Sequence, residues 1–220
     1  MDISHTEENY LKAIFKISER DGKPASTNAI STEMNTSAAS VTDMVKRLSD
    51  KALIHYERYR GVTLTELGEE TATHLIRKHR LWEVFLVDKL HFSWDEVHEI
   101  AEQLEHIKSA GLVERLDEYL GFPKFDPHGD PIPDADGNFV IRKQVLLSEL
   151  KREEQGVVVG VQDHTTAFLQ YLDRMELVLG TPVKLLEYFD YDESMRVLIN
   201  GEREQVLSKK VCQNLFVQKQ

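Results

Sequence analysis

The sequence predicts a mainly α-helical chain that begins with a winged helix-turn-helix and ends in a small β-rich module. Apolar residues recur at helical spacing through most of the first 120 residues, with turn-forming residues between the runs. Two short strand-like runs, 53–57 and 62–64, flank a glycine-containing turn directly after the third predicted helix. Further strand-like runs occur only after residue 144. The chain therefore divides at about 121–144.

Three helices precede the wing. Residues 4–19 predict an amphipathic helix, because Tyr10, Ile14 and Ile17 fall on one stripe. A short helix around Ile30 follows, and then a longer helix from about residue 37. The turn-forming and capping residues between them are Asp21-Gly22-Lys23-Pro24, Ser26 or Thr27, and Asn35-Thr36-Ser37.

The elements after the wing begin with a long helix over about 66–90. Ser93-Trp94-Asp95-Glu96 is typical of a helix cap, and we expect that helix to run to about Lys108. Residues 121–138 contain four prolines and four aspartates, which indicates a loop or linker. The remaining expectations are a helix over 114–120, a short helix or strand over 145–150, a helix over 168–177, and strands over 156–161, 183–188, 195–199 and 215–217.

Composition limits the possible classes of protein. The chain has 220 residues, of which 41% are hydrophobic and 30% charged, so it can bury a core in one to two domains. Its one cysteine, Cys212, excludes a disulfide framework and a thiolate-rich zinc finger. We expect a cytoplasmic protein without membrane association, because we find neither a secretory leader nor an apolar run of about 18 residues.

Charge is unevenly distributed along the chain. The formal net charge is −11, which argues against a protein that coats nucleic acid with its whole surface. The segment from Lys23 to Thr65 has six basic and four acidic residues, so its charge is +2 and the rest of the chain carries −13. A locally positive module on an acidic body is compatible with DNA binding.

The winged helix-turn-helix pattern favours double-stranded DNA as a partner. The helix from Ser37 offers small, hydrogen-bonding side chains to a major groove, and nearby basic residues can meet phosphates. An ordinary helical bundle with a surface hairpin is the alternative. The candidate DNA-binding residues are Thr36, Ser37, Ala39, Ser40, Thr42, Asp43, Lys46, Arg47, Arg58 and Arg60.

A second pattern indicates a metal site. His98, Glu102, Glu105 and His106 have offsets of 0, 4, 7 and 8, so on one continuous helix they share a face. His79 and Glu83 are four residues apart on the preceding helix. Carboxylate and imidazole ligands suit Mn²⁺ or Fe²⁺ better than structural zinc. The alternative is a solvated acidic helix face.

Two weaker pairs and several absent motifs complete the pattern. Asp126 and His128 in the linker can chelate a metal or simply form a polar turn, and Asp163-His164 is equally ambiguous. The sequence contains no Gly-x-Gly-x-x-Gly, P-loop, Gly-x-Ser-x-Gly or His-Glu-x-x-His motif. We therefore expect neither an enzyme nor an organic cofactor.

Four short segments are informative when taken together: Thr6–Leu11, Ser40-Val41-Thr42, Arg77–Leu81 and Glu102–His106. With them the chain resembles the diphtheria-toxin-repressor family of iron- or manganese-dependent transcriptional regulators. The resemblance covers nearly the whole chain and implies three domains. These are a DNA-binding domain over 1–72, a helical metal-binding and dimerisation domain with linker over 73–144, and an SH3-like (FeoA-type) β-barrel over 145–220.

The resemblance implies a primary metal site made of Asn9, Glu102, Glu105 and His106. Iron-responsive members have a sulfur ligand where Glu102 stands and a methionine where Asn9 stands, whereas manganese-responsive members have acids at both. Lys12 stands where some manganese members have another acid, which places their two-ion arrangement in question. The oxygen-rich set favours Mn²⁺, with Fe²⁺ second.

An ancillary site is implied as well. Its expected ligands His79, Glu83 and His98 are all present. The family's Cys-Pro-His-Gly segment resembles Asp126-Pro127-His128-Gly129, with aspartate in place of cysteine. Asp163 from the C-terminal domain would complete this site, and His164 is an alternative donor.

The resemblance also implies the mode of action. We expect a homodimer that binds operator DNA when Mn²⁺ or Fe²⁺ is bound, most simply a repressor that controls metal homeostasis. The alternatives from the sequence are a winged-helix regulator with an organic effector, a hydrolytic metalloenzyme, and an interaction module whose β-rich tail binds a peptide.

Overall fold

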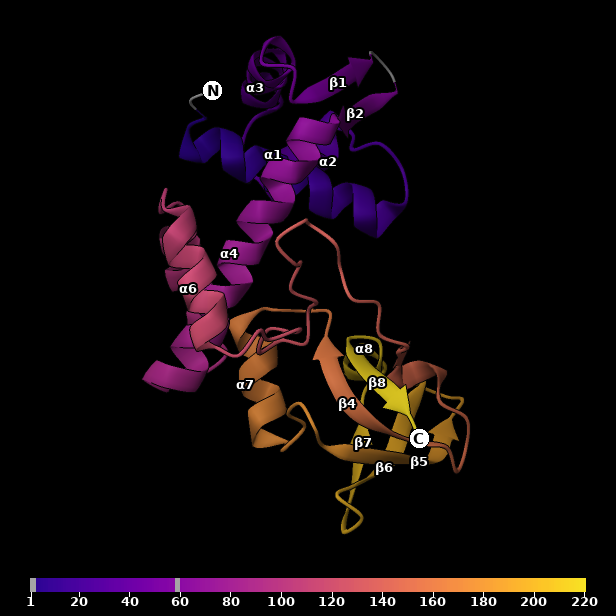
Figure 1. The fold of residues 1–220 in the computed structure, drawn as a ribbon. Helices are drawn as coiled ribbons and strands as arrows, with labels where there is room; N and C mark the ends of the chain where they lie inside the picture. The colour runs from indigo at the N-terminus through magenta and orange to yellow at the C-terminus, as the bar shows by residue number, and fades with distance from the viewer. Residues whose placement is uncertain (1–2, 58–59) are drawn as a thin grey trace. The chain divides into compact units, whose positions relative to one another are not determined.

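The structure is a computed structural model that describes residues 3–57 and 60–220 (Figure 1). The chain forms two compact units. The first includes the chain up to His79 with residues 104–109 and 133–138, and the second includes 80–103, 110–132 and 139–220. The boundary after His79 falls inside one continuous helix, α4 (Glu66–Leu90). Each unit is described by itself.

The first unit contains the predicted winged helix-turn-helix. Its elements are α1 (His5–Asp21), α2 (Thr27–Glu33), α3 (Ala38–Asp50), β1 (Ile54–Glu57), β2 (Gly61–Leu64) and the first half of α4. Apolar side chains from all of these elements form one core around Leu11, Ile30, Leu48 and Val62, each fully buried. The predicted order of elements is confirmed.

Caps define the three helices of this unit. Ser4 and Glu7 form a reciprocal capping box at the start of α1, and Gly22 ends that helix in the left-handed conformation at φ +62°. The Ser26 side chain accepts a hydrogen bond from the backbone of Ala29, so Ser26 rather than Thr27 caps α2. Ser37 caps α3 in the same way.

The wing is a short antiparallel hairpin. Its register runs from Ile54 opposite Leu64 to Glu57 opposite Gly61. Gly61 has φ +105°, and a Cβ there would lie 2.8 Å from the carbonyl oxygen of Ala25. Glycine is therefore required at the position where the hairpin meets the segment before α2.

The second unit begins with the remainder of α4, followed by α5 (Val97–Leu104) and α6 (Ala110–Tyr119). Leu81 and Val84 of α4 pack with Leu116 of α6 and Ile132 of the following loop. The prediction that the fifth helix extends to about Lys108 is wrong, because α5 ends at Leu104. Glu105 and His106 lie in a turn beyond it, where side-chain contacts from distant segments replace helical pairing.

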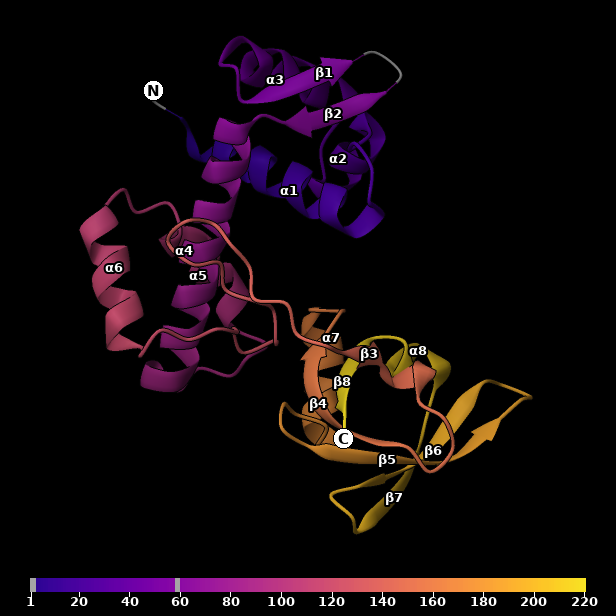
Figure 2. The same ribbon diagram turned by 45° about the vertical axis from the view of Figure 1, so that its right-hand side comes forward.

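The C-terminal domain is a six-stranded antiparallel sheet in the order β3-β8-β4-β5-β6-β7, with α7 and α8 beside it (Figure 2). Its core includes Leu147, Leu172, Val197 and Val217, all fully buried. Its elements are β3 (Val145–Leu146), a 3-10 turn (Leu147–Glu149), β4 (Gln155–Val161), α7 (Thr166–Arg174), β5 (Pro182–Phe189), β6 (Ser194–Ile199), β7 (Arg203–Leu207), α8 (Lys209–Cys212) and β8 (Leu215–Lys219).

The prediction of a small closed β-barrel is wrong, because this sheet is open. The edge strands are β3 and β7, and no ladder between them occurs among the described residues. Closure requires paired edges of matching length, whereas β3 has only two residues. Helices make up 44% and strands 20% of the structure, so the strand content is substantial beside the helices.

The α4–α5 loop shares the core of the C-terminal domain. The Trp94 ring packs in the cluster formed by the sheet and α7, and its indole N–H donates to Asp173 at 3.0 Å. Gln170 of α7 likewise donates to Asp95 at 2.8 Å.

Among the described residues, no helix combines the length and the apolar character that crossing a membrane needs.

Candidate metal centres and nucleic-acid interface

Glu105 is the centre of a buried polar cluster in the first unit. Its side chain is 0% exposed, and its two oxygens accept hydrogen bonds at 2.6 Å, one from Lys12 Nζ and one from His79 Nδ1. Burial disfavours the charged carboxylate, but His79 and Lys12 outweigh that effect and lower the pKa of Glu105. The carboxylate is therefore held in its ionised form.

His106 joins the same cluster from the other side. Its Nδ1 lies 2.6 Å from a carboxylate oxygen of Glu8, and its Nε2 lies 3.8 Å from Glu105. The His5 ring stacks on the His106 ring at 4.3 Å between centroids. We call Glu8, Lys12, His79, Glu105 and His106 the Glu105 cluster. It brings together α1, α4 and the turn after α5.

Asn9 lies on α1 next to this cluster. Its side-chain oxygen is buried and has no hydrogen-bond partner in the part of the chain that the structure describes. A buried amide oxygen without a partner is costly, and a bound cation would satisfy it. Asn9 therefore fits the ligand position that the family resemblance implies.

Glu102 is placed differently from Glu105 and His106. It lies on α5 in the second unit, is about half exposed, and has an oxygen 3.8 Å from His98 Nε2. The expectation that His98, Glu102, Glu105 and His106 share one helical face is wrong, because the helix ends between the two pairs. His98 and Glu102 remain neighbours on α5.

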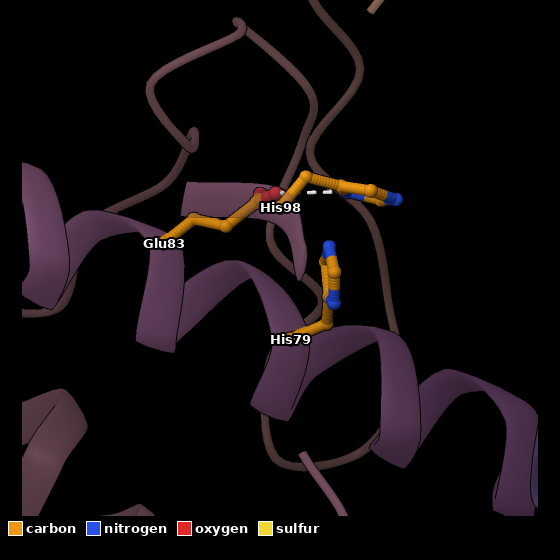
Figure 3. A group of neighbouring side chains, drawn as sticks. All are labelled: His79, Glu83 and His98. Carbon is orange, nitrogen blue, oxygen red and sulfur yellow. Dashed lines mark hydrogen bonds and ion pairs between the residues drawn. The ribbon is translucent and has the colours of Figure 1, made fainter. Parts of the chain in front are cut away.

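A second cluster surrounds Glu83, whose side chain is 2% exposed. His79 and Glu83 lie one turn apart on α4, and His98 Nδ1 of α5 lies 3.3 Å from a Glu83 oxygen. Figure 3 shows the two histidine rings and the carboxylate directed toward one another. Donor atoms of the three side chains lie within 4.8 Å of one another. The structure thus brings these three side chains together, and their role as metal ligands stays a prediction.

Glu83 also contacts the linker. Its other oxygen lies 3.6 Å from His128 Nδ1, and Glu83, Asp126 and His128 form a second group whose donor atoms lie within 4.8 Å. All three are buried. We call Glu83, His98, Asp126 and His128, with His79 one turn before Glu83 on the same helix, the Glu83 cluster.

The pKa values in this cluster are strongly shifted. Burial, with the nearby charges of Asp130 and Glu83, raises the pKa of Asp126 to about 7. Burial opposes the charge of His128, but its hydrogen bond to Glu83 raises the pKa of the imidazole to about 9. The Arg80 guanidinium lies 3.5 Å from Asp126 and 3.1 Å from Asp130, so it partly balances these acids. Such clustering of buried ionisable groups is typical of functional sites.

The linker loop fixes the orientation of His128. Asp126 accepts hydrogen bonds from the backbone of His128 and Asp130, and His128 Nε2 is 2.8 Å from the carbonyl oxygen of Trp94. With Nε2 engaged there, Nδ1 faces Glu83. A Cβ on Gly129 would lie 2.1 Å from the carbonyl oxygen of Val159, so only glycine allows the loop to lie against β4.

The C-terminal domain offers two candidate donors, Asp163 and His164, and the structure places them differently. Asp163 accepts a hydrogen bond from the backbone of Thr165 before α7, and the described metal-ligand groups do not include it. The His164 ring stacks on His128 at 4.9 Å, and its Nε2 lies 4.0 Å from Asp130. His164 is thus in direct contact with a member of the Glu83 cluster.

The candidate DNA-binding residues of α3 lie on its exposed face, opposite buried Val41, Val45 and Leu48. Local hydrogen bonds, such as Ser37 to Ser40 and Thr42 to the carbonyl of Ala38, orient these short polar side chains. The exposed positions are Ser37, Ala39, Ser40, Thr42, Asp43, Lys46 and Arg47, with Thr36 half-buried before the cap.

The wing adds basic side chains. Arg60 is exposed and pairs with Glu57 at 3.0 Å. Arg58 lies outside the described residues.

Neither the sequence nor its resemblance indicated Glu8, although Glu8 and Lys12 are four apart and so share a face of α1. That spacing was the available signal for a second carboxylate at the metal centre.

Family profiles cover most of the chain. Residues 2–62 match "Iron dependent repressor, N-terminal DNA binding domain", and residues 65–134 match "Iron dependent repressor, metal binding and dimerisation domain". Residues 145–219 match "FeoA domain".

Several relatives are about one-third identical to the chain over the aligned residues. The iron-dependent repressor IdeR of Mycobacterium leprae is 34% identical over 184 residues, which is 80% of both chains. The diphtheria toxin repressor of Corynebacterium diphtheriae is 31% identical over 91% of this chain and 92% of that protein. IdeR of Mycobacterium tuberculosis H37Rv is 34% identical over 60% of this chain, and the match spans only 57% of that relative's length.

Solved structures give the same result. A manganese-dependent transcriptional repressor in complex with manganese has a TM-score of 0.86 at 31% identity, covering 97% of this chain and all of that one. The manganese regulator SloR has a TM-score of 0.76 at 34% identity, covering 97% and 98%. ScaR with bound Zn²⁺ has a TM-score of 0.77 at 35% identity, covering 97% and 99%.

Proposed function

This chain belongs to the iron- and manganese-dependent repressor family that includes the diphtheria toxin repressor, and on that premise we propose that it is a metal-dependent transcriptional repressor. It binds operator DNA as a homodimer when Mn²⁺ or Fe²⁺ is bound, and it controls metal homeostasis. The observation that supports this most directly is the pair of buried carboxylate–imidazole clusters beside a winged helix-turn-helix. We keep the proposed domain division of 1–72, 73–144 and 145–220.

The DNA-reading surface consists of α3 and the wing. Small polar side chains on the exposed face of α3 suit a major groove, while Lys46, Arg47 and Arg60 suit phosphates. In a two-fold dimer the two α3 helices must lie about one helical turn of DNA apart, roughly 34 Å. The basic segment supplies most of the affinity through phosphate contacts.

The primary metal site consists of Asn9, Glu105 and His106 with Glu8, and we retain Glu102 as a candidate ligand. The buried oxygen of Asn9 and the ionised carboxylate of Glu105 fit a hard divalent cation. Oxygen donors outnumber nitrogen donors, so Mn²⁺ is the preferred ion and Fe²⁺ the second. When bound, the ion supplies positive charge that holds these donors together.

The ancillary site is the Glu83 cluster. Its donors are Glu83, His79, His98, Asp126 and His128, and a donor from the C-terminal domain, Asp163 or His164, completes it. Because no thiolate is present, this site also favours Mn²⁺ over softer metals.

Residues of α1 relate the primary site to the DNA-reading helix. Glu8 contacts His106 of the Glu105 cluster at 2.6 Å, whereas the preceding residue, Glu7, binds Lys51 at 2.8 Å. Lys51 is the C-cap of α3. The first two turns of α1 therefore contact both the metal centre and the recognition helix. If the metal ion binds the DNA-binding conformer more tightly by about 1–3 kcal/mol, it changes the affinity for operator DNA about 5- to 150-fold.

The organic-effector alternative has no support among the relatives, which are metal-dependent repressors. A direct test measures binding of a labelled promoter fragment by fluorescence anisotropy, with Mn²⁺, with Fe²⁺ under anaerobic conditions, and after dialysis against EDTA. We expect tight binding only with metal. Equal affinity after removal of metal would overturn the proposal.

Variants test the site assignment. Glu105→Ala or His106→Ala should abolish metal-activated binding while the protein remains folded and dimeric. The matched control is His91→Asn, because His91 is exposed, lies outside both clusters and has a positive φ that asparagine accepts. Wild-type metal dependence in the Glu105 or His106 variant would show that the primary site is misassigned.

A further inference from the structure

Asp43 places a carboxylate on the outer side of α3. It is the one charged residue in the first two turns of that helix. Because successive residues of an α-helix are rotated by about 100°, Asp43 projects roughly 200° away from Val41, opposite the buried stripe that Val41 begins. Its side chain is 71% exposed. When this side of α3 enters a major groove, the carboxylate opposes binding to the DNA polyanion unless a donor on a base pairs with it.

The residues around Asp43 let its carboxylate come close to a base edge. Ala39 lies one turn before it on the same face of the helix, and Ala38 and Ser40 are small as well. All three are exposed. An aspartate side chain is short, so it reaches a base only where its helix lies deep in the groove. The small side chains at the start of α3 permit that depth.

The neutral polar side chains beside Asp43 are engaged by the helix itself. The hydroxyl oxygens of Ser37 and Ser40 lie 2.9 Å apart, and the Thr42 hydroxyl donates to a backbone carbonyl oxygen one turn earlier at 2.9 Å. The Asp43 carboxylate lies 4.0 Å from Lys46 Nζ, and both side chains are mostly exposed. Water weakens such a pair, so a better donor can replace it. Asp43 thus offers the strongest acceptor in the first two turns of α3.

The major-groove edges of the four bases differ in what they offer to a carboxylate. Guanine presents two acceptors, N7 and O6, and thymine presents the O4 acceptor and a methyl group, so neither can donate to it. Adenine presents an amino donor with the N7 acceptor beside it, and that acceptor repels a second acceptor. Cytosine presents its N4 amino donor with no acceptor next to it. Cytosine is therefore the base that best fits a carboxylate.

We propose that Asp43 is a specificity-determining residue that accepts a hydrogen bond from the N4 amino group of one cytosine in each half of the operator. This inference rests on the proposed function, because it needs α3 to enter the major groove. The carboxylate contributes discrimination rather than affinity, since it favours duplexes with this cytosine and disfavours the others. Lys46 and Arg47, which follow on the next turn, supply the attraction to phosphates that offsets its charge.

The test selects binding sites for the full-length protein with Mn²⁺ from a randomised duplex library and then measures affinities for the selected duplex. We expect the wild type to fix one cytosine in each half-site, and replacing that C·G pair by A·T should lower the affinity about tenfold. Asp43→Asn should select adenine at the same position, because a carboxamide pairs with N6 and N7 of adenine. Asp50→Asn makes the same change two turns later at an exposed position of α3 and should keep the cytosine.

A modified base tests the contact itself. N4-methylcytosine still pairs with guanine but carries a methyl group in place of the amino hydrogen that faces the major groove. It should lower the affinity of the wild type about as much as the A·T replacement does, and it should leave the affinity of Asp43→Ala unchanged. Asp43→Ala should also bind random-sequence duplex more tightly than the wild type, because a charge that repels phosphates has been removed.

The outcomes separate the two proposals. If the wild type selects no duplex in the presence of Mn²⁺, the proposed function fails. If the wild type selects a site and Asp43→Asn selects the same bases, the role of Asp43 is overturned while the proposed function stands. A wild-type affinity that N4-methylcytosine leaves unchanged would overturn that role as well.

Discussion

Asp126 is a buried acidic residue in the linker loop. Its carboxylate is 4% exposed and lies with Glu83 and His128 in a group of hard and borderline donors. The related segment in the family has cysteine at this position. The difference between an oxygen and a sulfur donor should therefore appear as a difference in metal preference.

We predict that Asp126→Cys raises the affinity for Cd²⁺ relative to Mn²⁺ by at least about tenfold, because a thiolate is the softer ligand. Competition titrations with a metal-sensitive dye measure the ratio. Asp136→Cys introduces the same thiol at an exposed position of the loop and should leave the ratio unchanged. Equal ratios in the two variants would remove Asp126 from the ligand set.

His128 gives a pH dependence to the metal-free protein. Its pKa is raised to about 9 in the folded protein, above its ordinary value of 6.5, so it stabilises the fold fully below pH 6.5. That contribution, about 3 kcal/mol at most, is lost as the pH rises through 9. The raised pKa of Asp126, about 7, acts in the same direction, because its ionisation becomes a cost as the pH rises from 4 to 7.

We therefore expect the melting temperature of chelator-treated protein to fall between pH 6.5 and pH 9. Differential scanning calorimetry at several pH values measures the change. In His128→Asn the titrating group is absent and the profile should be flatter. A profile in that variant as steep as in the wild type would assign the effect to other groups.

At the same scale, the sequence predicted which side chains lie together better than it predicted their hydrogen-bond partners. Spacing and resemblance indicate Asp126, His128 and Glu83, and the structure places these three together, while their role as ligands stays a prediction. Glu8 was missed because a carboxylate on the first turn of a helix is common there, where it favours the helix dipole. Only the position of His106 in the folded chain, 2.6 Å from Glu8, shows that Glu8 belongs to the Glu105 cluster.

At the scale of elements, the ion pair between Glu7 and Lys51 joins α1 to the end of α3. Glu7 is nearly buried, and Lys51 lowers its pKa against the effect of burial, which raises it. Lys51 is about a third exposed, so solvent weakens the pair, and its worth to stability is about 1 kcal/mol or less. Its position matters more than its energy.

We predict that Lys51→Met lowers operator affinity about fivefold at saturating Mn²⁺ while Mn²⁺ binding stays unchanged, because α3 loses its link to the metal-binding helix. Anisotropy and calorimetry measure the two quantities. Lys23→Met is the control, since Lys23 is exposed in the same domain and lies in the segment between α1 and α2. Parallel losses of metal and DNA affinity would indicate general damage instead.

Helix ends were the least predictable part of the elements. Periodicity identified α5, but its continuation past Leu104 depended on Glu105 and His106 remaining helical. Each of these residues instead makes a hydrogen bond of 2.6 Å to a residue far away in the sequence. Local spacing contains no information about those distant partners, so the end of the helix could not be derived from it.

At the scale of the whole molecule, charge separates the DNA-reading segment from the rest. The segment from Lys23 to Thr65 is positive within a chain of net charge −11. The acidic remainder should repel DNA, so binding should depend on a small number of basic side chains on α3 and the wing.

We predict that Arg47→Ala and Arg60→Ala each weaken binding to every DNA sequence and reduce the salt slope by about one. Affinities measured from low to moderate salt give the slope. Lys210→Ala, an exposed position in the C-terminal domain, should leave it unchanged. An unaltered slope in either arginine variant would exclude that residue from the phosphate contacts.

The order of domains could be read from the sequence, whereas the form of the last domain could not. Alternation of apolar residues identified most of its strands, but β7 and α8 were missed, and the sheet is open rather than closed. Closure depends on the length and pairing of edge strands, and the two-residue β3 leaves little pattern in the sequence.

Trp94 has a consequence for the autonomy of the C-terminal domain. Its indole completes a core that is otherwise formed mainly by residues beyond 144. A shortened protein that stops at the linker would expose this large aromatic surface to water and so become prone to aggregation. We therefore expect a chain truncated at the linker to be more soluble with a polar residue at position 94 than with tryptophan.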